Sequence, residues 1–241
     1  MGRTRRRGRL GLRLLAVALV VAAGALAWEV STWPDVARLA RERPATTAFI
    51  EHHKAAQRAL GRSDRVAWAW VPYAAIASEV KRAVLVAEDI NFFSHLGFDL
   101  GEVQLAVEEA VRERELPRGA STITQQLAKN LWLSPSRNPW RKGKEAILTW
   151  QLERTLGKRR ILELYLNVVE LGPGLYGVEA ASRHYFGRPA AALGEAEAAQ
   201  LAAALPRPGA WGPGADSPAY RRRVASIRER MARATFLLRQ I

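Results

Sequence analysis

A long apolar run near the N-terminus constrains this chain more strongly than any other feature of the sequence. The run carries no charge from Leu14 to Trp28, and counted from Leu10 it approaches the ~20 residues that a helix needs to cross a bilayer. Several arginines precede the run and no Lys or Arg follows it before Arg38, so the positive-inside rule predicts a cytoplasmic N-terminus. We therefore expect a basic cytoplasmic tail over 1–9 and a single transmembrane anchor over 10–28, with the rest of the chain outside.

Two other interpretations of this segment stay open at the level of sequence. Ala25-Leu26-Ala27 resembles a signal-peptidase site, and the arginine pairs before the run are compatible with a twin-arginine signal. Trp28 is a good interfacial residue for the end of a membrane helix, which favours an anchor that is not cleaved.

The composition limits the chemistry that the rest of the chain can perform. A net charge of +14 fits a nucleic acid, an anionic membrane or a phosphorylated substrate as partner. The chain has no cysteine, which excludes disulfides, thiolate metal sites and a thiol nucleophile. Its 4 histidines form no His-x-x-x-His pair, which argues against a zinc site.

The pattern of apolar residues after the anchor predicts an all-α fold. Prolines punctuate residues 29–72, which we expect to be a connector with short helices, and the remaining domain is expected over 73–241. No convincing alternating strand pattern occurs in it. Helices are expected over 78–88, from 122, from 140, over 158–172, from 176 to about 186, over 193–205 and from 220 onwards.

One of these helices has the pattern of a segment that lines a cleft. Thr122-x-x-Gln125 fits a capping box at its start. Spacings of three and four residues give a polar stripe of Thr122, Gln126 and Lys129, and an apolar stripe of Ile123, Leu127 and Leu131. An ordinary amphipathic surface helix would show the same stripes, but its polar face is usually rich in Glu and Lys rather than Thr and Gln.

Acidic residues end the expected helix over 78–88, and their burial would need partners. Glu88 and Asp89 follow an apolar run, and His95 comes shortly after them. Asp89 and His95 could simply brace this turn. A glutamate at the edge of a cleft, with its pKa raised by apolar neighbours, is alternatively a good general base, and Glu88 is the candidate.

Basic residues gather around the next turn and helix. Lys129, Arg137, Arg141, Lys142 and Lys144 bring the charges that bind a diphosphate, and no Gly-rich phosphate loop is present. Arg141 and Glu145 are i, i+4 neighbours that could instead form a plain surface ion pair. Lys158 looks like a surface residue at the start of the following helix.

Taken together, five segments in order resemble the five motifs of the peptidoglycan glycosyltransferases of family 51, over roughly residues 75 to 205. They are Glu88-Asp89-x-x-Phe92-x-x-His95-x-Gly97-x-Asp99, Gly119-x-Ser121-Thr122-x-Thr124-Gln125-Gln126-Leu127-x-Lys129-Asn130, Arg141-Lys142-x-x-Glu145, Ile161-Leu162-Glu163-x-Tyr165-Leu166-Asn167 and Ala180-Ala181-x-x-x-Tyr185-Phe186-Gly187. Ile90 departs from the pattern, since many members have a basic residue there, and no arginine occurs over 100–110, which leaves part of the donor subsite unassigned.

The resemblance implies a lysozyme-like, all-α glycosyltransferase domain behind a single transmembrane helix, in the bacterial cytoplasmic (inner) membrane with the catalytic domain in the periplasm. The implied reaction transfers a growing undecaprenyl-diphosphate-linked glycan chain to the 4-hydroxyl of lipid II with inversion. Glu88 would be the general base, and Glu145 would act beside the departing diphosphate. The implied substrate-binding residues are Asp89, Phe92, His95, Ser121, Thr122, Gln126, Lys129, Asn130, Arg137, Arg141, Lys142 and Lys144.

The resemblance also sets expectations for cofactors and partners. No tightly bound cofactor is expected, although Mg²⁺ or Mn²⁺ could act through Glu145 and the diphosphate. Other cell-wall synthesis or cell-division proteins are conceivable partners, and nucleic acid is not expected. Two alternatives stay open: a lytic glycosidase of similar fold, and a non-catalytic, membrane-anchored protein that binds polyanions.

Overall fold

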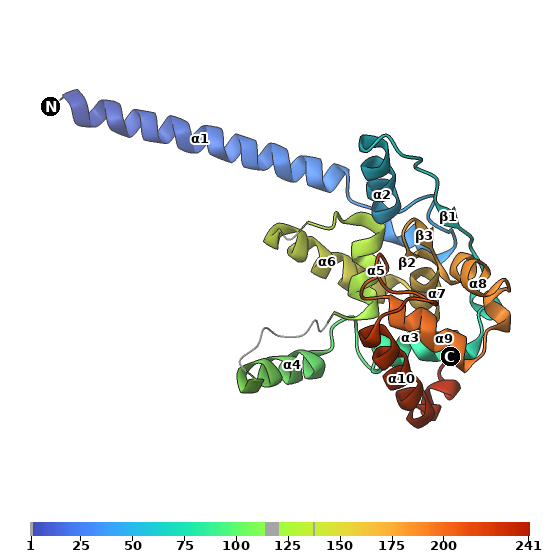
Figure 1. Ribbon diagram of the computed structural model, residues 1–241. Coiled ribbons are helices and arrows are strands. Elements are labelled where there is room, and N and C mark those ends of the chain that lie inside the picture. The colour runs from blue at the N-terminus through green and yellow to red at the C-terminus, as the bar shows by residue number, and fades with distance from the viewer. Residues whose placement is uncertain (1, 114–120, 137) are drawn as a thin grey trace. The chain divides into compact units, whose positions relative to one another are not determined.

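The computed structural model describes residues 2–113, 121–136 and 138–241 (Figure 1). The chain divides into two units, Met1–Asp35 and Val36–Ile241. The first unit contains one long helix, α1 (Gly2–Ser31). The second contains the remaining helices and a small sheet.

The side chains of α1 that the structure describes face outwards without a protein core to cover them. Val20 is 72% exposed and Trp28 is 69% exposed. Among the described residues, this is the one helix that is long and apolar enough to cross a membrane. Exposed apolar surface on this scale is unfavourable in water, so α1 is consistent with a single-pass membrane anchor.

Helices dominate the second unit, which confirms the predicted all-α class. In chain order they are η1 (Val36–Ala40), α2 (Ala48–Ala59), η2 (Tyr73–Ala75), α3 (Ser78–Glu88), α4 (Leu100–Glu113), α5 (Ile123–Trp132), α6 (Pro139–Thr155), α7 (Lys158–Val168), α8 (Val178–Phe186), η3 (Ala190–Ala192), α9 (Glu195–Ala204), α10 (Pro218–Arg233) and η4 (Thr235–Arg239).

A small sheet, which the sequence did not predict, interrupts this helical pattern. Within the described residues it consists of β1 (Ala67–Trp68), β2 (Glu170–Gly172) and β3 (Leu175–Tyr176), in the order β1-β3-β2. β3 pairs parallel with β1 and antiparallel with β2. The helix expected over 158–172 therefore ends at Val168, because the next residues form a hairpin whose other partner strand is about 100 residues earlier in the chain.

The core lies where α5 and α3 meet their neighbours. α5 packs against α2, α6 and α7, and α3 packs against α9 and α10. Ile123 and Leu127 of α5, Leu85 of α3 and Tyr165 of α7 are fully buried. Most alanines of α9 are also buried, and their small side chains let α3 approach that helix closely.

The segment that the sequence indicated as a connector contributes to the same unit. η1, α2 and β1 lie within Val36–Ile241, although the domain was expected to start at residue 73. Thr47 caps α2 by accepting a hydrogen bond from the Ile50 amide at 3.1 Å, and Ile50 is buried. Arg160 of α7 donates to the Leu39 carbonyl at 2.8 Å.

Candidate active site

Glu88 is the last residue of α3, and two other helices supply hydrogen-bond donors to its carboxylate. Gln126 of α5 donates from Nε2 to Glu88 Oε2 at 3.0 Å, and Arg223 of α10 donates from Nη2 to Glu88 Oε1 at 3.0 Å. The Glu88 side chain is only 13% exposed. Burial raises the pKa of Glu88, and the bonds from Gln126 and Arg223 offset only part of that rise. A carboxylate in this state is suited to accept a proton.

A buried tyrosine fixes the orientation of the Gln126 amide. Tyr165 of α7 donates its hydroxyl proton to Gln126 Oε1 at 2.8 Å, which leaves Nε2 to face Glu88. Burial raises the pKa of Tyr165 well above its usual value, and the nearby Glu88 and Asp89 carboxylates raise it further. The phenol therefore stays protonated and remains a donor.

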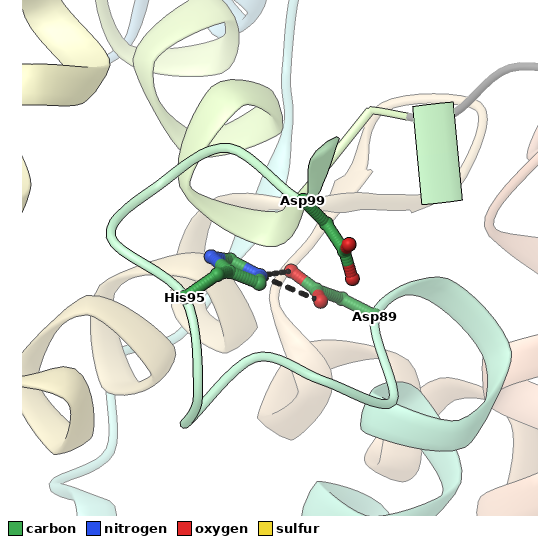
Figure 2. Close-up of side chains that lie close together, drawn as sticks. All are labelled: Asp89, His95 and Asp99. Carbon is green, nitrogen blue, oxygen red and sulfur yellow. Dashed lines mark hydrogen bonds and ion pairs between the residues drawn. The ribbon is translucent and has the colours of Figure 1, made fainter. Parts of the chain in front are cut away.

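The turn after α3 is braced by Asp89 and His95 (Figure 2). His95 Nε2 lies 2.9 and 3.1 Å from the two carboxylate oxygens of Asp89, and the Gly97 amide donates to His95 Nδ1 at 3.1 Å. Since Nδ1 accepts, Nε2 carries the proton that is donated to Asp89. Asp89 Oδ2 also accepts from the Ile123 amide at 2.9 Å, so the turn holds the first residue of α5.

The start of α5 carries the predicted capping box, which is confirmed. Thr122 Oγ1 accepts from the Gln125 amide at 3.2 Å, and Gln125 Oε1 accepts from the Thr122 amide at 3.0 Å. The Thr122 hydroxyl also donates to the Gly97 carbonyl at 2.7 Å. Gly97 has a φ of +90°, and a Cβ there would lie 2.8 Å from Thr149 Cγ2, so this close approach requires glycine.

Phe92 belongs to the interior of this turn. It is fully buried, with its ring 5.1 Å from that of Phe93, and the Lys158 ammonium lies 4.4 Å from its ring centre. Lys158 also pairs with Glu153 at 2.8 Å. The expectation that Lys158 is a plain surface residue is therefore wrong, because it bridges a buried ring and a carboxylate. Asp89, Phe92 and His95 are gathered here beneath the surface rather than along an open face.

Glu145, in the first half of α6, is enclosed by basic side chains. Arg141 Nη1 donates to Glu145 Oε2 at 2.7 Å, and Lys142 Nζ binds Glu145 Oε1. The Glu145 side chain is 4% exposed, whereas that of Lys142 is 52% exposed. Arg141 Nε additionally donates to the Ser136 carbonyl at 2.6 Å. The alternative of a plain surface pair is wrong, because the carboxylate is buried.

Lys129 of α5 connects the two carboxylates electrostatically. Burial lowers the pKa of its ammonium group; the Glu145 and Glu88 carboxylates raise this pKa, and Arg141 and Lys142 lower it. The Lys129 ammonium also lies 5.5 Å from the Phe49 ring centre. One cation on the predicted polar stripe thus interacts with both carboxylates at once.

The other predicted site residues take varied positions. Ser121 is exposed, and its carbonyl oxygen lies 3.4 Å from Gln126 Nε2. Asn130 is buried in α5, and Lys144 is half-buried in α6. Arg137 lies outside the described residues.

One group of side chains among the described residues lies close enough together to hold a metal ion, but its ligand atoms already have hydrogen-bond partners. Asp89, His95 and Asp99 place one ligand atom each within 4.8 Å of one another. His95 Nε2 carries a proton, however, and Asp99 accepts from the Asn91 side chain at 2.9 Å and the Glu102 amide at 3.0 Å. Both oxygens of Glu145 are bound by basic side chains, so the predicted Mg²⁺ or Mn²⁺ would have to displace them.

Two residues in contact with this site were not among the site residues predicted from the sequence. Tyr165 lies within one of the five motifs; it is fully buried, and its hydrogen bond orients the Gln126 amide. Arg223 lies far from all five motifs, in a helix with many arginines, so no sequence signal singled it out.

Comparison with known proteins defines the class first. The family model described as Transglycosylase matches residues 54–232, which is most of the chain. The chain is therefore a transglycosylase. Its relatives narrow this class further.

A biosynthetic peptidoglycan transglycosylase of Thiobacillus denitrificans is 47% identical over 188 residues, covering 78% of this chain and 81% of the relative. The protein of the same name from Azoarcus sp. is 46% identical over 199 residues, covering 83% and 84%. That of Nitrosomonas eutropha is 40% identical over 191 residues, covering 79% and 78%. The chain belongs to the biosynthetic peptidoglycan transglycosylase family.

Proposed function

We propose that this chain polymerises lipid II by transferring the growing undecaprenyl-diphosphate-linked glycan chain to the 4-hydroxyl of a lipid II acceptor. As a member of its family it is a peptidoglycan glycosyltransferase. The observation that best supports the detailed proposal is the pairing of a buried carboxylate, Glu88, with a separate cluster of cations around Glu145, with Lys129 interacting with both.

In the proposed reaction Glu88 is the general base. The acceptor's 4-hydroxyl oxygen bonds to the anomeric carbon of the donor as its proton passes to a Glu88 oxygen, and the bond from that carbon to the diphosphate breaks with inversion. Gln126 and Arg223 each bind one Glu88 oxygen, and each oxygen keeps a further lone pair for the acceptor hydroxyl.

The departing diphosphate is assigned to Lys129, Arg141 and Lys142. Charge grows on the leaving oxygen in the transition state, so preorganised cations stabilise that state more than the substrate. Glu145 holds Arg141 and Lys142 in place before the diphosphate binds, because its buried carboxylate balances charges that would otherwise repel. Arg137 and Lys144 remain predicted additions to this cluster, and Thr122, Ser121 and Asn130 remain predicted contacts to the sugars and phosphates.

Asp89, His95 and Phe92 act in this proposal as positioning residues. They brace the turn that follows α3 and tie it to the start of α5, and they therefore fix the distance between Glu88 and Gln126. This role replaces the direct substrate contact that the family resemblance implied for them. Direct contact would require buried side chains to leave their present partners.

The apolar helix α1 anchors the enzyme in the cytoplasmic membrane in this proposal, with the N-terminus inside and the catalytic unit in the periplasm. The arginines before the apolar run support that orientation. A tether keeps the active site near lipid-linked substrates and raises their effective concentration.

The proposal is tested by giving purified protein either labelled lipid II or finished peptidoglycan. Growth of glycan strands from lipid II supports the synthetic reaction. Release of fragments from finished peptidoglycan, with lipid II unchanged, would instead support a lytic glycosidase. Salt-dependent binding of polyanions without any product would support the non-catalytic alternative.

A further inference from the structure

Helix α10 lies outside every motif that marks the family, yet one of its arginines, Arg223, contacts the proposed general base Glu88. Arg223 Nη2 donates to Glu88 Oε1 at 3.0 Å and lies 3.4 Å from the Ala87 carbonyl oxygen. α10 packs against α3, the helix that Glu88 ends. Arg223 thus brings the C-terminal part of the chain into direct contact with the proposed active site.

The position of Arg223 on α10 differs from that of the neighbouring arginines. Tyr220, Ile227 and Met231 form the buried stripe of this helix, and Arg223 follows Tyr220 by three residues and precedes Ile227 by four. Its side chain is 29% exposed. Arg222, one position earlier, lies on the exposed face. The helix thus directs the Arg223 guanidinium group inwards, whereas that of Arg222 stays on the exposed face.

We propose that Arg223 is a positioning residue of the glycosyl transfer, which holds the Glu88 carboxylate ionised and oriented for the acceptor hydroxyl. The inference rests on the proposed function, in which Glu88 is the base. Gln126 holds one carboxylate oxygen and Arg223 holds the other, so the plane of the carboxylate is fixed from two sides.

The charge balance around Glu88 shows why an arginine is needed there. α5 brings Gln126 and Lys129 and α10 brings Arg223 and Arg230; Asp89 follows directly in the chain, and the Tyr165 phenol interacts with the carboxylate. Burial alone favours a protonated carboxyl, which cannot act as a base. Arg223 supplies both a hydrogen bond and a direct positive charge, and both favour the ionised form.

One donor of the Arg223 guanidinium group is left without a hydrogen bond at this place, within the described part of the chain. Its Nε is buried and has no hydrogen-bond partner among the residues that the structure describes. A buried donor left without a partner is unfavourable. The Arg223 side chain thus leaves Nε without a hydrogen bond to any described residue while its Nη2 donates to Glu88.

The consequence is a specific change in pH dependence. Burial raises the pKa of the Glu88 carboxyl group, and the Arg223 guanidinium charge lowers it. Removing that charge therefore lets the pKa rise further. Activity needs the ionised form, so the acid limb of kcat/KM moves to higher pH. Well above the new pKa, only a smaller loss remains, which comes from the less firmly oriented carboxylate. An opposite charge at this distance shifts a carboxyl pKa by at least about one unit, and each unit means a roughly tenfold lower rate on the acid side.

The test measures polymerisation of lipid II by the full chain in detergent, at constant ionic strength, from about pH 5 to about pH 9, so that a shift of the acid limb to higher pH is recorded. The variants are Arg223→Gln, Arg223→Lys and Arg222→Gln. We expect the acid limb of Arg223→Gln to move up by about one unit, that of Arg223→Lys to move less, and that of Arg222→Gln to match wild type. Arg222→Gln removes the same charge from the exposed face of the same helix.

An unchanged acid limb in Arg223→Gln would overturn the inference, and so would an equal fold loss at every pH, which indicates a structural role. Circular dichroism checks folding, and if Arg223→Gln is unfolded, the acid limb of Arg223→Met, which also removes the charge, decides by the same criterion. If wild type polymerises lipid II and the acid limb of Arg223→Gln is not shifted, this inference is refuted and the proposed function is not. An inactive wild type contradicts the proposed function and the inference with it.

Discussion

Asp89→Asn is expected to destabilise the catalytic unit strongly while changing a single atom of the side chain. The Asp89 carboxylate is 3% exposed and accepts from His95 Nε2 and from the Ile123 amide. Asparagine keeps one acceptor oxygen, but its NH₂ group then faces the other donor. One charge-assisted hydrogen bond is lost and two donors compete for one oxygen.

The size of this effect follows from the number of bonds affected. A hydrogen bond to a charged group contributes about 1.5–3 kcal/mol, and a buried donor left without a partner costs a similar amount. We expect a loss of about 3 kcal/mol, which lowers the melting temperature of a unit of this size by roughly 6–12 °C. Thermal unfolding of the full chain in detergent, followed by circular dichroism, measures it.

Asp216→Asn is the matched control, since it makes the same chemical change at a side chain that is 93% exposed. Its ion pair with Arg221 lies in solvent, so the melting temperature should stay within about 2 °C of wild type. Similar melting temperatures for Asp89→Asn and Asp216→Asn would refute the claim that the hydrogen bonds of the Asp89 carboxylate are needed to hold the turn to α5.

Three further predictions concern the cation cluster and the anchor. Lys129→Gln should lower kcat by roughly 10²–10³-fold, because one preorganised charge that stabilises the transition state is lost. Arg222→Gln removes the same charge from an exposed position, and an equal loss of kcat in this control would mean that only the net charge matters. In Glu145→Gln, inorganic pyrophosphate should raise the melting temperature more than in wild type, because the anion replaces the lost carboxylate among the cations; equal shifts would contradict that role. A chain that starts at Val36 should fold and polymerise lipid II in detergent but work more slowly on neutral vesicles, and equal rates on vesicles would argue against a tether.

Much of the fold was predictable wherever local signals agreed with each other. The helix expected over 78–88 matches α3, and the capping box at Thr122 starts α5 as its sequence indicates. Both rely on interactions between residues a few positions apart. The polar stripe of α5 was also predictable, since Gln126 and Lys129 lie one turn apart on the same face of one helix.

What the sequence could not indicate depends on contacts between distant segments. The hairpin that ends α7 at Val168 is stabilised by pairing of β3 with β1 about 100 residues away, which overrides the local helix pattern. The bond from Arg223 to Glu88 spans 135 positions, and no family motif marks Arg223 among the many arginines of its helix. Lys158 is a similar case, because its partner Phe92 comes from a different turn.

The most direct test of the central claim compares wild type with Glu88→Gln on labelled lipid II, with binding and polymerisation measured separately. The substitution removes the proton acceptor but keeps the shape of the side chain and an oxygen for one of the donors from Gln126 and Arg223. The account predicts lipid II binding close to that of wild type and polymerisation slower by roughly 10²–10⁴-fold. Near-normal polymerisation by a folded Glu88→Gln protein would contradict the assignment of Glu88 as the general base.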